Sequence, residues 1–199
     1  MKLRSDQSDT SFLYLVYNTV NGKVKLYFES RQSMEFRYLK KSDVEAYRLL
    51  RLQSLQTDPT GFASTYQREI HMPIDRFEDR IGMNERHFTM GVFDGEKLIG
   101  YATFYRETLE KIKHRGNLVG VYCDPQYRRR GFTQQLIQKM IDIVSEQGVV
   151  KTIGLSVLAE NLSAIKLYEK LGFQRYGTEP KALYDGKRYY DEDLMVLFL

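Results

Sequence analysis

Apolar and polar residues alternate along some segments of the chain and recur with a helical period along others. Near the N-terminus, two strand-like runs flank Asn21-Gly22, and the second run alternates from Val24 to Phe28. Asn-Gly accepts the positive φ angles of a type I′ turn, which joins the strands of tight hairpins. Residues 1–33 are therefore expected to contain a β-hairpin outside the main domain. The alternative is a leader without fixed structure, with Met34 as a second start site.

The segment 34–199 mixes the two periods and is expected to form one α/β domain of the α+β kind. Apolar residues recur every three or four positions in four predicted helices, at residues 40–55, 72–82, 134–147 and 161–171. Apolar or alternating runs predict seven strands, in the segments MEFRYL, HFTMGVF, KLIGYATFY, NLVGVYC, TIGLSVL, FQRYG and DEDLMVLFL. The resulting order is β-α-α-β-β-β-α-β-α-β-β.

The first predicted helix leaves two details open. Either Ser42 or Asp43 is expected to cap its N-terminus, because a short side-chain oxygen accepts a hydrogen bond from the free N–H groups there. Either Leu49 or Leu50 is expected to face the core on the helical stripe.

Composition narrows the class of protein. With 199 residues, 42% hydrophobic and 28% charged, the chain has the make-up of a globular protein with one domain and an appendage. Its apolar runs are too short to cross a bilayer, so neither a membrane partner nor a signal peptide is expected. The single cysteine, Cys123, excludes a disulfide framework or a thiolate zinc cluster, and the histidines lack metal-ligand spacing, so no metal is expected. These features fit a reducing, cytoplasmic setting.

Three consecutive arginines, Arg128 to Arg130, precede Gly131 between a predicted strand and a predicted helix. The N-terminus of a helix exposes free N–H groups and the positive end of the helix dipole, so it attracts phosphate. Glycine lets a ligand approach the main chain, and arginine adds permanent charge. The pattern predicts a diphosphate site. The alternatives are an import label, a solvated patch or a nucleic-acid surface, but a net charge of +4 with 26 acidic residues argues against nucleic acid.

The segment Arg128 to Thr133 resembles the diphosphate motif of the GNAT superfamily of acetyl-CoA-dependent N-acetyltransferases. That motif reads Gln/Arg-x-x-Gly-x-Gly/Ala; Arg128 and Gly131 match it, whereas Thr133 replaces the usual Gly or Ala. The resemblance implies that acetyl-CoA is bound as a cosubstrate, with no metal. The cofactor-binding residues that it implies in this loop are Arg128, Arg129, Arg130, Gly131, Phe132 and Thr133.

A second segment, NLSAIKLYEKLGF, carries the resemblance further. Asn161 and Tyr168 are seven residues apart and therefore lie near one another on a helix. In the family, the asparagine contacts the CoA arm, and the tyrosine hydroxyl lies near the thioester sulfur and can protonate the departing thiolate. The resemblance thus implies a cofactor-binding role for Asn161 and a catalytic role for Tyr168. Their simpler roles are a helix cap and a core aromatic residue.

The resemblance covers Met34 to Leu199 and implies the family's fold. That fold is a mixed, mainly antiparallel sheet, flanked by helices and splayed between its fourth and fifth strands, with CoA in the opening. On the fourth strand, N–H groups around Val121, Tyr122 and Cys123 are expected to hold the acetyl oxygen. The thiol of Cys123 is expected to be an inert part of the core.

The implied reaction needs a base, because an amine attacks only when it is neutral. Many family members carry a glutamate on the fourth strand, but NLVGVYC offers none. The carboxylates that could replace it are Glu69, Asp124, Asp191 and Glu192. A lysine-like amine with a pKa of ~10.4 is neutral in about one molecule in 2,500 at pH 7, whereas an α-amine with a pKa of ~8 is neutral in about one in ten. The missing glutamate favours an α-amine or a base that acts through water.

These residues predict an N-acetyltransferase that moves an acetyl group from acetyl-CoA to a primary amine by direct transfer in a ternary complex. The alternative is a CoA-binding regulatory module without turnover, which the missing glutamate suggests. The sequence leaves the acceptor open between a small molecule, a polyamine, an antibiotic and a peptide. A homodimer is the assembly that the resemblance suggests, and the N-terminal hairpin could pair with a partner subunit.

Overall fold

The computed structural model describes the backbone of residues 12–20, 23–31 and 34–199 and the side chains of residues 34–199. Strands β1 (Phe12–Val20) and β2 (Lys23–Arg31) pair in antiparallel fashion, with Val20 opposite Lys23. The predicted hairpin strands are therefore present, while the Asn21-Gly22 turn lies outside the described residues. The division of the chain after residue 33 stays a prediction.

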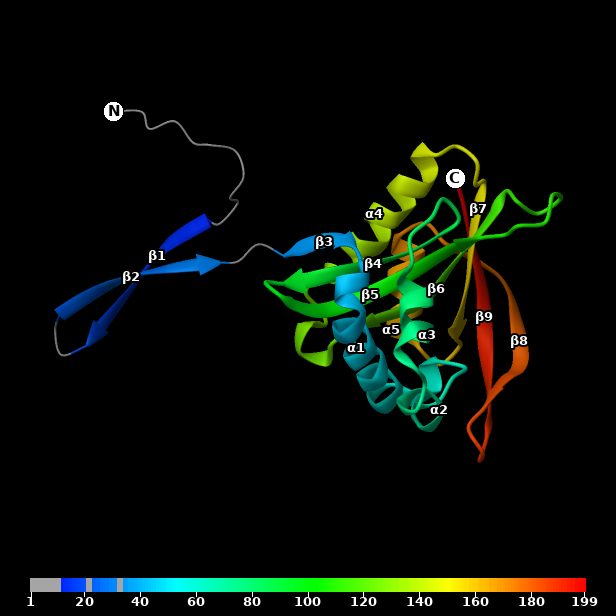
Figure 1. The fold of residues 1–199 in the computed structure, drawn as a ribbon, viewed down its shortest axis with the longest axis horizontal. Helices are drawn as coiled ribbons and strands as arrows, with labels where there is room; N and C mark the ends of the chain where they lie inside the picture. The colour runs from blue at the N-terminus through cyan, green and yellow to red at the C-terminus, as the bar shows by residue number, and fades with distance from the viewer. Residues whose placement is uncertain (1–11, 21–22, 32–33) are drawn as a thin grey trace.

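Seven further strands form one sheet in the order β3-β4-β5-β6-β7-β9-β8 (Figure 1). Their bounds are β3 (Glu35–Tyr38), β4 (His87–Asp94), β5 (Lys97–Arg106), β6 (Arg115–Cys123), β7 (Thr152–Leu158), β8 (Gln174–Tyr184) and β9 (Tyr189–Phe198). The β6–β7 pair is parallel, and every other neighbouring pair in this sheet is antiparallel. This confirms the predicted mixed, mainly antiparallel sheet.

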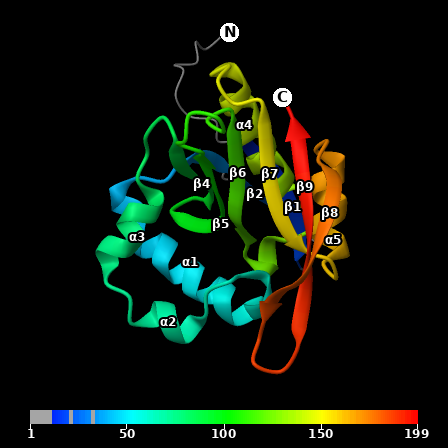
Figure 2. The ribbon, with the colours of Figure 1, turned by 90° about the vertical axis from the view of Figure 1, so that its right-hand side faces the viewer.

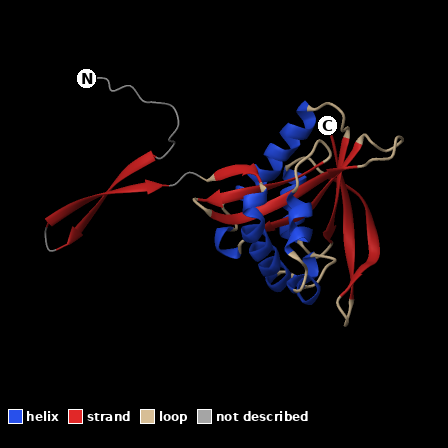
Figure 3. Cartoon of the chain, in the orientation of Figure 1, coloured by secondary structure: helices blue, strands red, loops and turns tan. Residues whose placement is uncertain are grey.

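Helices cover both faces of the sheet (Figures 2 and 3). The helices are α1 (Val44–Thr57), α2 (Tyr66–Ile70), α3 (Ile74–Ile81), α4 (Phe132–Glu146) and α5 (Leu162–Lys170), with single 3₁₀ turns at Lys41–Asp43, Pro59–Gly61 and Pro125–Tyr127. One hydrophobic cluster joins α1 and α3 to the sheet, and a larger one joins α4 and α5 to the opposite face. The apolar stripes of these helices are thus buried against the sheet, as their sequence periods predict.

The structure settles both open details of α1. Leu50 is 4% exposed and Leu49 is 65% exposed, so Leu50 faces the core. Asp43 occupies the N-cap position, but its carboxylate accepts from the main chain of Lys40 and pairs with Arg37 instead of capping the helix directly.

Several element boundaries differ from the prediction. The short helix α2 had no apolar stripe to reveal it, because only Glu69 among its residues is buried. Helix α4 begins at Phe132, two residues before the predicted start, because Gly131 provides the chain reversal that opens it. Strand β8 continues past the predicted FQRYG segment to Tyr184, where its residues are mostly exposed and carry little hydrophobic signal.

The sheet opens between β6 and β7, the fourth and fifth strands counted from β3. These strands pair only from Arg115 to Asn117 on β6 and from Thr152 to Gly154 on β7. Beyond these pairs the two strands diverge, so their C-terminal halves leave hydrogen-bonding edges that face each other across a gap. The splay that the family resemblance implied is therefore present.

Glu69 joins the three helices α1, α2 and α3 through a buried ion network. Its carboxylate is fully buried and accepts from Arg51 at 3.1 and 2.9 Å and from Arg80 at 2.7 Å. Burial by itself would raise the pKa of Glu69, but the hydrogen bonds from both arginines outweigh burial and lower that pKa to about 2. An anion held so firmly between two cations is a structural group, which makes Glu69 a poor general base.

Replacing Glu69 with glutamine is expected to lower the free energy of unfolding by about 3–5 kcal/mol at pH 7, because Arg51 is left buried without its counter-charge. The folded-state pKa of about 2 lies below the ordinary value of 4.5. The carboxylate's contribution is therefore complete above pH 4.5 and is lost as the pH falls towards 2. Urea unfolding at pH 7 and pH 3 measures both effects, and the difference between wild type and variant should shrink at pH 3. The exposed Glu45→Gln is the matched control; an equal loss in both variants would contradict the assignment.

Candidate active site

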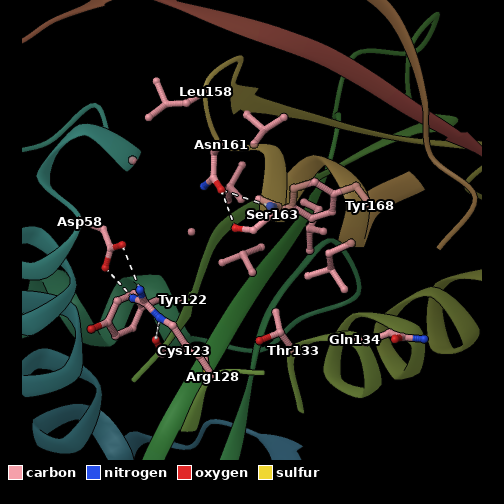
Figure 4. Close-up of a pocket in the computed structure, with 18 of the residues that line it drawn as sticks. Asp58, Tyr122, Cys123, Arg128, Thr133, Gln134, Leu158, Asn161, Ser163 and Tyr168 are labelled. Carbon is pink, nitrogen blue, oxygen red and sulfur yellow. Dashed lines mark hydrogen bonds and ion pairs between the residues drawn. The ribbon is translucent and has the colours of Figure 1, made fainter. Parts of the chain in front are cut away.

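A cleft of about 540 Å³ occupies the splay between β6 and β7 (Figure 4). Every residue of the site predicted from the sequence except Arg130 lines this cleft. The structure thus brings together the end of β6, the arginine loop and the start of α5, which are far apart in sequence. The roles of the individual residues stay predictions.

A β-bulge in β6 shapes the wall of the cleft. Tyr122 pairs with Tyr101 and Val119 pairs with Thr103, so Gly120 and Val121 together stand opposite a single residue of β5. Gly120 has a φ of +61°, which an L side chain rarely adopts. A bulge of this kind re-aims the strand locally, and here it does so at the point where the strand borders the cleft.

The main chain at Cys123 offers a donor to the cleft. The next residue, Asp124, donates its N–H to the carbonyl of Ile99 on β5 at 2.8 Å. Because successive N–H groups of a strand point to opposite edges, the N–H of Cys123 faces away from β5 and towards β7. Cys123 itself is buried, and burial raises the pKa of its thiol, in agreement with an inert core cysteine.

The loop into α4 has the backbone of an anion site. Arg129 and Gly131 have φ angles of +62° and +79°, and Gly131 occupies the N-cap position of α4. Within the described part of the chain, no acceptor bonds the N–H groups from Arg129 to Gln134. A Cβ added at Gly131 would meet only the Gln135 side chain, at 3.8 Å, so the positive φ rather than crowding selects glycine here. Residues that alternate between right-handed and left-handed backbone conformations turn their successive N–H groups into one concave surface. Such a surface binds anions.

The three arginines of this loop point in different directions. Arg128 pairs with Asp58 and donates to the carbonyl of Cys123, whereas Arg130 donates to the carbonyl of Gln126 and lies over the Tyr127 ring. Arg129 is exposed and lines the cleft. The charge predicted for this loop is present, but the guanidinium of Arg128 is already engaged.

Asn161 and Tyr168 lie on the opposite wall, on α5. Asn161 caps the helix by accepting from the N–H of Ala164 at 3.1 Å and from the Ser163 hydroxyl at 3.0 Å (Figure 4). Tyr168 is 7% exposed, and its ring packs edge-on against Phe173. Its hydroxyl makes no hydrogen bond to any residue that the structure describes. Burial raises the pKa of Tyr168, so the hydroxyl keeps its proton and is available as a donor.

Of the four carboxylates proposed as bases, Glu192 alone lines the cleft. It is half-buried on β9, opposite Leu158 of β7. Asp124 instead accepts from Lys97 and from the main chain of Gln126, and Asp191 accepts from the main chain of Lys181.

Two further segments line the cleft, and the sequence did not single out their residues as part of the cofactor site. They are the connection between α1 and α2, with Asp58, Gly61 and Phe62, and strand β7, with Ser156, Val157 and Leu158. The pairing of Asp58 with Arg128 had no signal in the sequence, because only the three-dimensional fold brings Asp58 next to the arginine loop.

The residues that the structure describes contain neither a candidate metal cluster nor a candidate membrane-spanning helix. Among them, no three or more His, Cys, Asp or Glu side chains gather in a way that could hold a metal ion. No described helix combines the length and the apolar character that crossing a bilayer requires.

The chain belongs to the acetyltransferase (GNAT) family, whose family model matches residues 48–173. This is a family of acyl-CoA N-acyltransferases, and the match spans the cleft from the α1 side to the end of α5.

Individual relatives agree with this membership. Over 158 residues the chain is 28% identical to the L-amino acid N-acetyltransferase AaaT of Escherichia coli K12, covering 78% of this chain and 91% of that protein. Over 123 residues it is 28% identical to the ribosomal protein bS18-alanine N-acetyltransferase of the same organism, covering 61% and 79%. The structure of yncA from Salmonella typhimurium, described with its cofactor acetyl-CoA, superposes with a TM-score of 0.70 at 20% identity, covering 84% and 94%. This last likeness shows the fold.

Proposed function

We propose that the protein transfers the acetyl group of acetyl-CoA directly to the α-amine of an amino acid or peptide, in a ternary complex. The observation that carries the proposal is the cleft in the splay, with a free run of N–H groups at one end and the Tyr168 hydroxyl on its wall. An anion-binding loop and a proton donor, joined by one opening, suit a thioester with a diphosphate tail.

The loop supports the binding of the pyrophosphate. The N–H groups from Arg129 to Thr133 and the positive end of α4 would hold the phosphate oxygens, and the exposed side chain of Arg129, which lines the cleft, would add charge. Asn161 lines the same cleft as this loop and Tyr168, and its side chain would contact the CoA arm there. The donors fit a dianionic group without a metal ion.

The chemistry follows from the two walls of the cleft. The neutral amine attacks the thioester carbonyl carbon, a C–N bond forms, and the C–S bond breaks. The Cys123 N–H stabilises the negative charge that develops on the carbonyl oxygen. Tyr168 gives its proton to the leaving thiolate, and the proton lost by the amine passes to a carboxylate. The products are an N-acetyl amine and CoA.

Two considerations favour an α-amine as the acceptor. The bulged strand β6 carries no carboxylate, so little help is available next to the reacting carbon for a strongly protonated amine. The pKa of an α-amine, ~8, lies only about one unit above pH 7, so about one molecule in ten is already neutral without a base. Both relatives described above are named for α-amine substrates, free L-amino acids in one case and an alanine of a ribosomal protein in the other.

The test is CoA thiol release from acetyl-CoA with a panel of amines. L-amino acids and peptides with free N-termini should support release, while N-acetylated peptides with internal lysines should not. Binding of acetyl-CoA in calorimetry without thiol release from any amine would instead leave the chain as a regulatory module.

Glu192→Gln is expected to lower kcat/KM by about tenfold for an α-amine acceptor at pH 7, because only the fraction of amine that is already neutral can then react. The loss should shrink as the pH rises towards ~8.5. A loss of roughly a thousandfold would point to a lysine-like acceptor. Glu179→Gln is the matched control, since Glu179 is the exposed neighbour of Glu192 across the β8–β9 pair. Equal activity in both variants and wild type would remove Glu192 from its role.

A further inference from the structure

The side chain of Arg128 is turned away from the loop that carries it. Its two terminal nitrogens meet the carboxylate of Asp58 at 3.3 and 2.6 Å, and its Nε donates to the carbonyl of Cys123 at 2.9 Å. The guanidinium also lies over the ring of Tyr122, 5.6 Å from its centroid. Asp58 and Cys123 together take three of the five N–H donors of the Arg128 guanidinium.

The carboxylate of Asp58 is itself held from a second side. The hydroxyl of Thr57 donates to it at 2.7 Å and lies 2.9 Å from the hydroxyl of Tyr122. Tyr122 is a buried residue of β6. The ion pair therefore joins the end of α1 to the strand and the loop that form the cofactor side of the cleft (Figure 4).

Asp58 opens the segment 58–62, which crosses the mouth of the cleft. Asp58, Gly61 and Phe62 line the cleft, and the Pro59–Gly61 turn lies against β7 on the far side of the splay. This segment is thus tied to the β6 side by its first residue and rests on the β7 side by its turn. It forms the part of the wall that an acceptor entering from the α1–α2 side would meet.

We propose that Arg128 is a positioning residue: its side chain fixes the segment 58–62 through Asp58, so that the loop that binds the pyrophosphate also sets the wall for the acceptor amine. The inference rests on the proposed function, which identifies the two bound molecules as acetyl-CoA and the acceptor amine. It assigns the pyrophosphate to the main chain of the loop and leaves the Arg128 side chain on Asp58 when acetyl-CoA is bound. The opposing possibility is that Arg128 leaves Asp58 for the phosphate.

Two single variants and their double variant separate these possibilities. If the ion pair persists, Arg128→Gln and Asp58→Asn raise the KM of the acceptor by the same factor, roughly fivefold, which is the upper end for a partly exposed pair. The double variant should then match either single one, because the second change removes nothing more. The Kd of acetyl-CoA in calorimetry should stay within about twofold of wild type in all three. Glu78→Gln, which breaks the surface pair with Lys41, is the matched control and should change neither constant.

The proposal is overturned if Arg128→Gln weakens acetyl-CoA binding while Asp58→Asn leaves it unchanged or strengthens it, since Arg128 would then act on the phosphate. The proposal is equally overturned if the double variant raises the acceptor KM by the product of the two single-variant factors, because the two side chains would then act independently. Hydrogen exchange provides a readout that does not depend on turnover: amides of residues 58–62 should exchange faster to the same extent in both variants, with unchanged exchange in α4. A protein that fails to transfer acetyl groups but shows this exchange pattern would sink the proposed function and keep the structural role of the ion pair.

Discussion

Replacing Gly131 with valine is expected to abolish measurable acetyl-CoA binding while the fold persists. Gly131 has a φ of +79° at the N-cap of α4, and a β-branched residue in that conformation is strained by about 1–2 kcal/mol or more. The loop would relax to a negative φ and turn its N–H groups away from the phosphate. Losing two charge-assisted hydrogen bonds corresponds to a rise in Kd of roughly 100-fold or more. Isothermal titration calorimetry with acetyl-CoA measures this rise in Kd.

The other end of the same helix supplies the control. Gly148 follows α4 and has a φ of +68°, and a Cβ added there would meet no atom within 4 Å. Gly148→Val therefore imposes similar backbone strain away from the cleft. It should lower thermal stability as Gly131→Val does, yet bind acetyl-CoA normally. Unchanged acetyl-CoA affinity in Gly131→Val would refute the anion site.

Replacing Tyr168 with phenylalanine is expected to lower kcat by roughly 10²–10⁴-fold, the usual contribution of a positioned general acid. The hydroxyl is the only group removed, and it makes no hydrogen bond within the described chain, so the packing against Phe173 is kept. The affinity for acetyl-CoA should stay nearly unchanged. Steady-state kinetics of thiol release, together with calorimetry, separate these two quantities.

Tyr176→Phe provides the comparison, because Tyr176 is a 63% exposed tyrosine on β8 that does not line the cleft. It should have wild-type kcat. Normal turnover in Tyr168→Phe would show that the thiolate departs without help from this residue.

The sequence predicted the framework of the fold because the framework depends on local signals. Helices α1, α3, α4 and α5 carry apolar stripes, and the strands of the β4–β5 hairpin carry a turn of Asp, Gly and Glu between them. Gly131 and the Arg128 run were visible as a motif because an anion site built on a helix N-terminus uses consecutive residues. Elements whose stability comes from distant contacts were harder to predict from the sequence. Helix α2 is held by the ion network of Glu69 and has no buried apolar stripe of its own.

The parts of the site that could not be predicted are those that distant segments share. The sequence suggested that Arg128 binds the cofactor, but the partner of its guanidinium is Asp58, which lies 70 residues earlier in the chain. Four carboxylates were equal candidates for the base, and only their packing distinguishes them. Glu69 is buried between two arginines, and Glu192 reaches the cleft because β9 pairs with β7 beside it.

The brief contact between β6 and β7 has a thermodynamic consequence. Three residue pairs supply the strand pairing between two parts of the sheet, β3 to β6 on one side and β7, β9 and β8 on the other. A coenzyme molecule bound in the cleft would contact both parts of the sheet where they do not pair. Because such a molecule binds the folded state and not the unfolded chain, the coenzyme concentration would add to the stability of the fold.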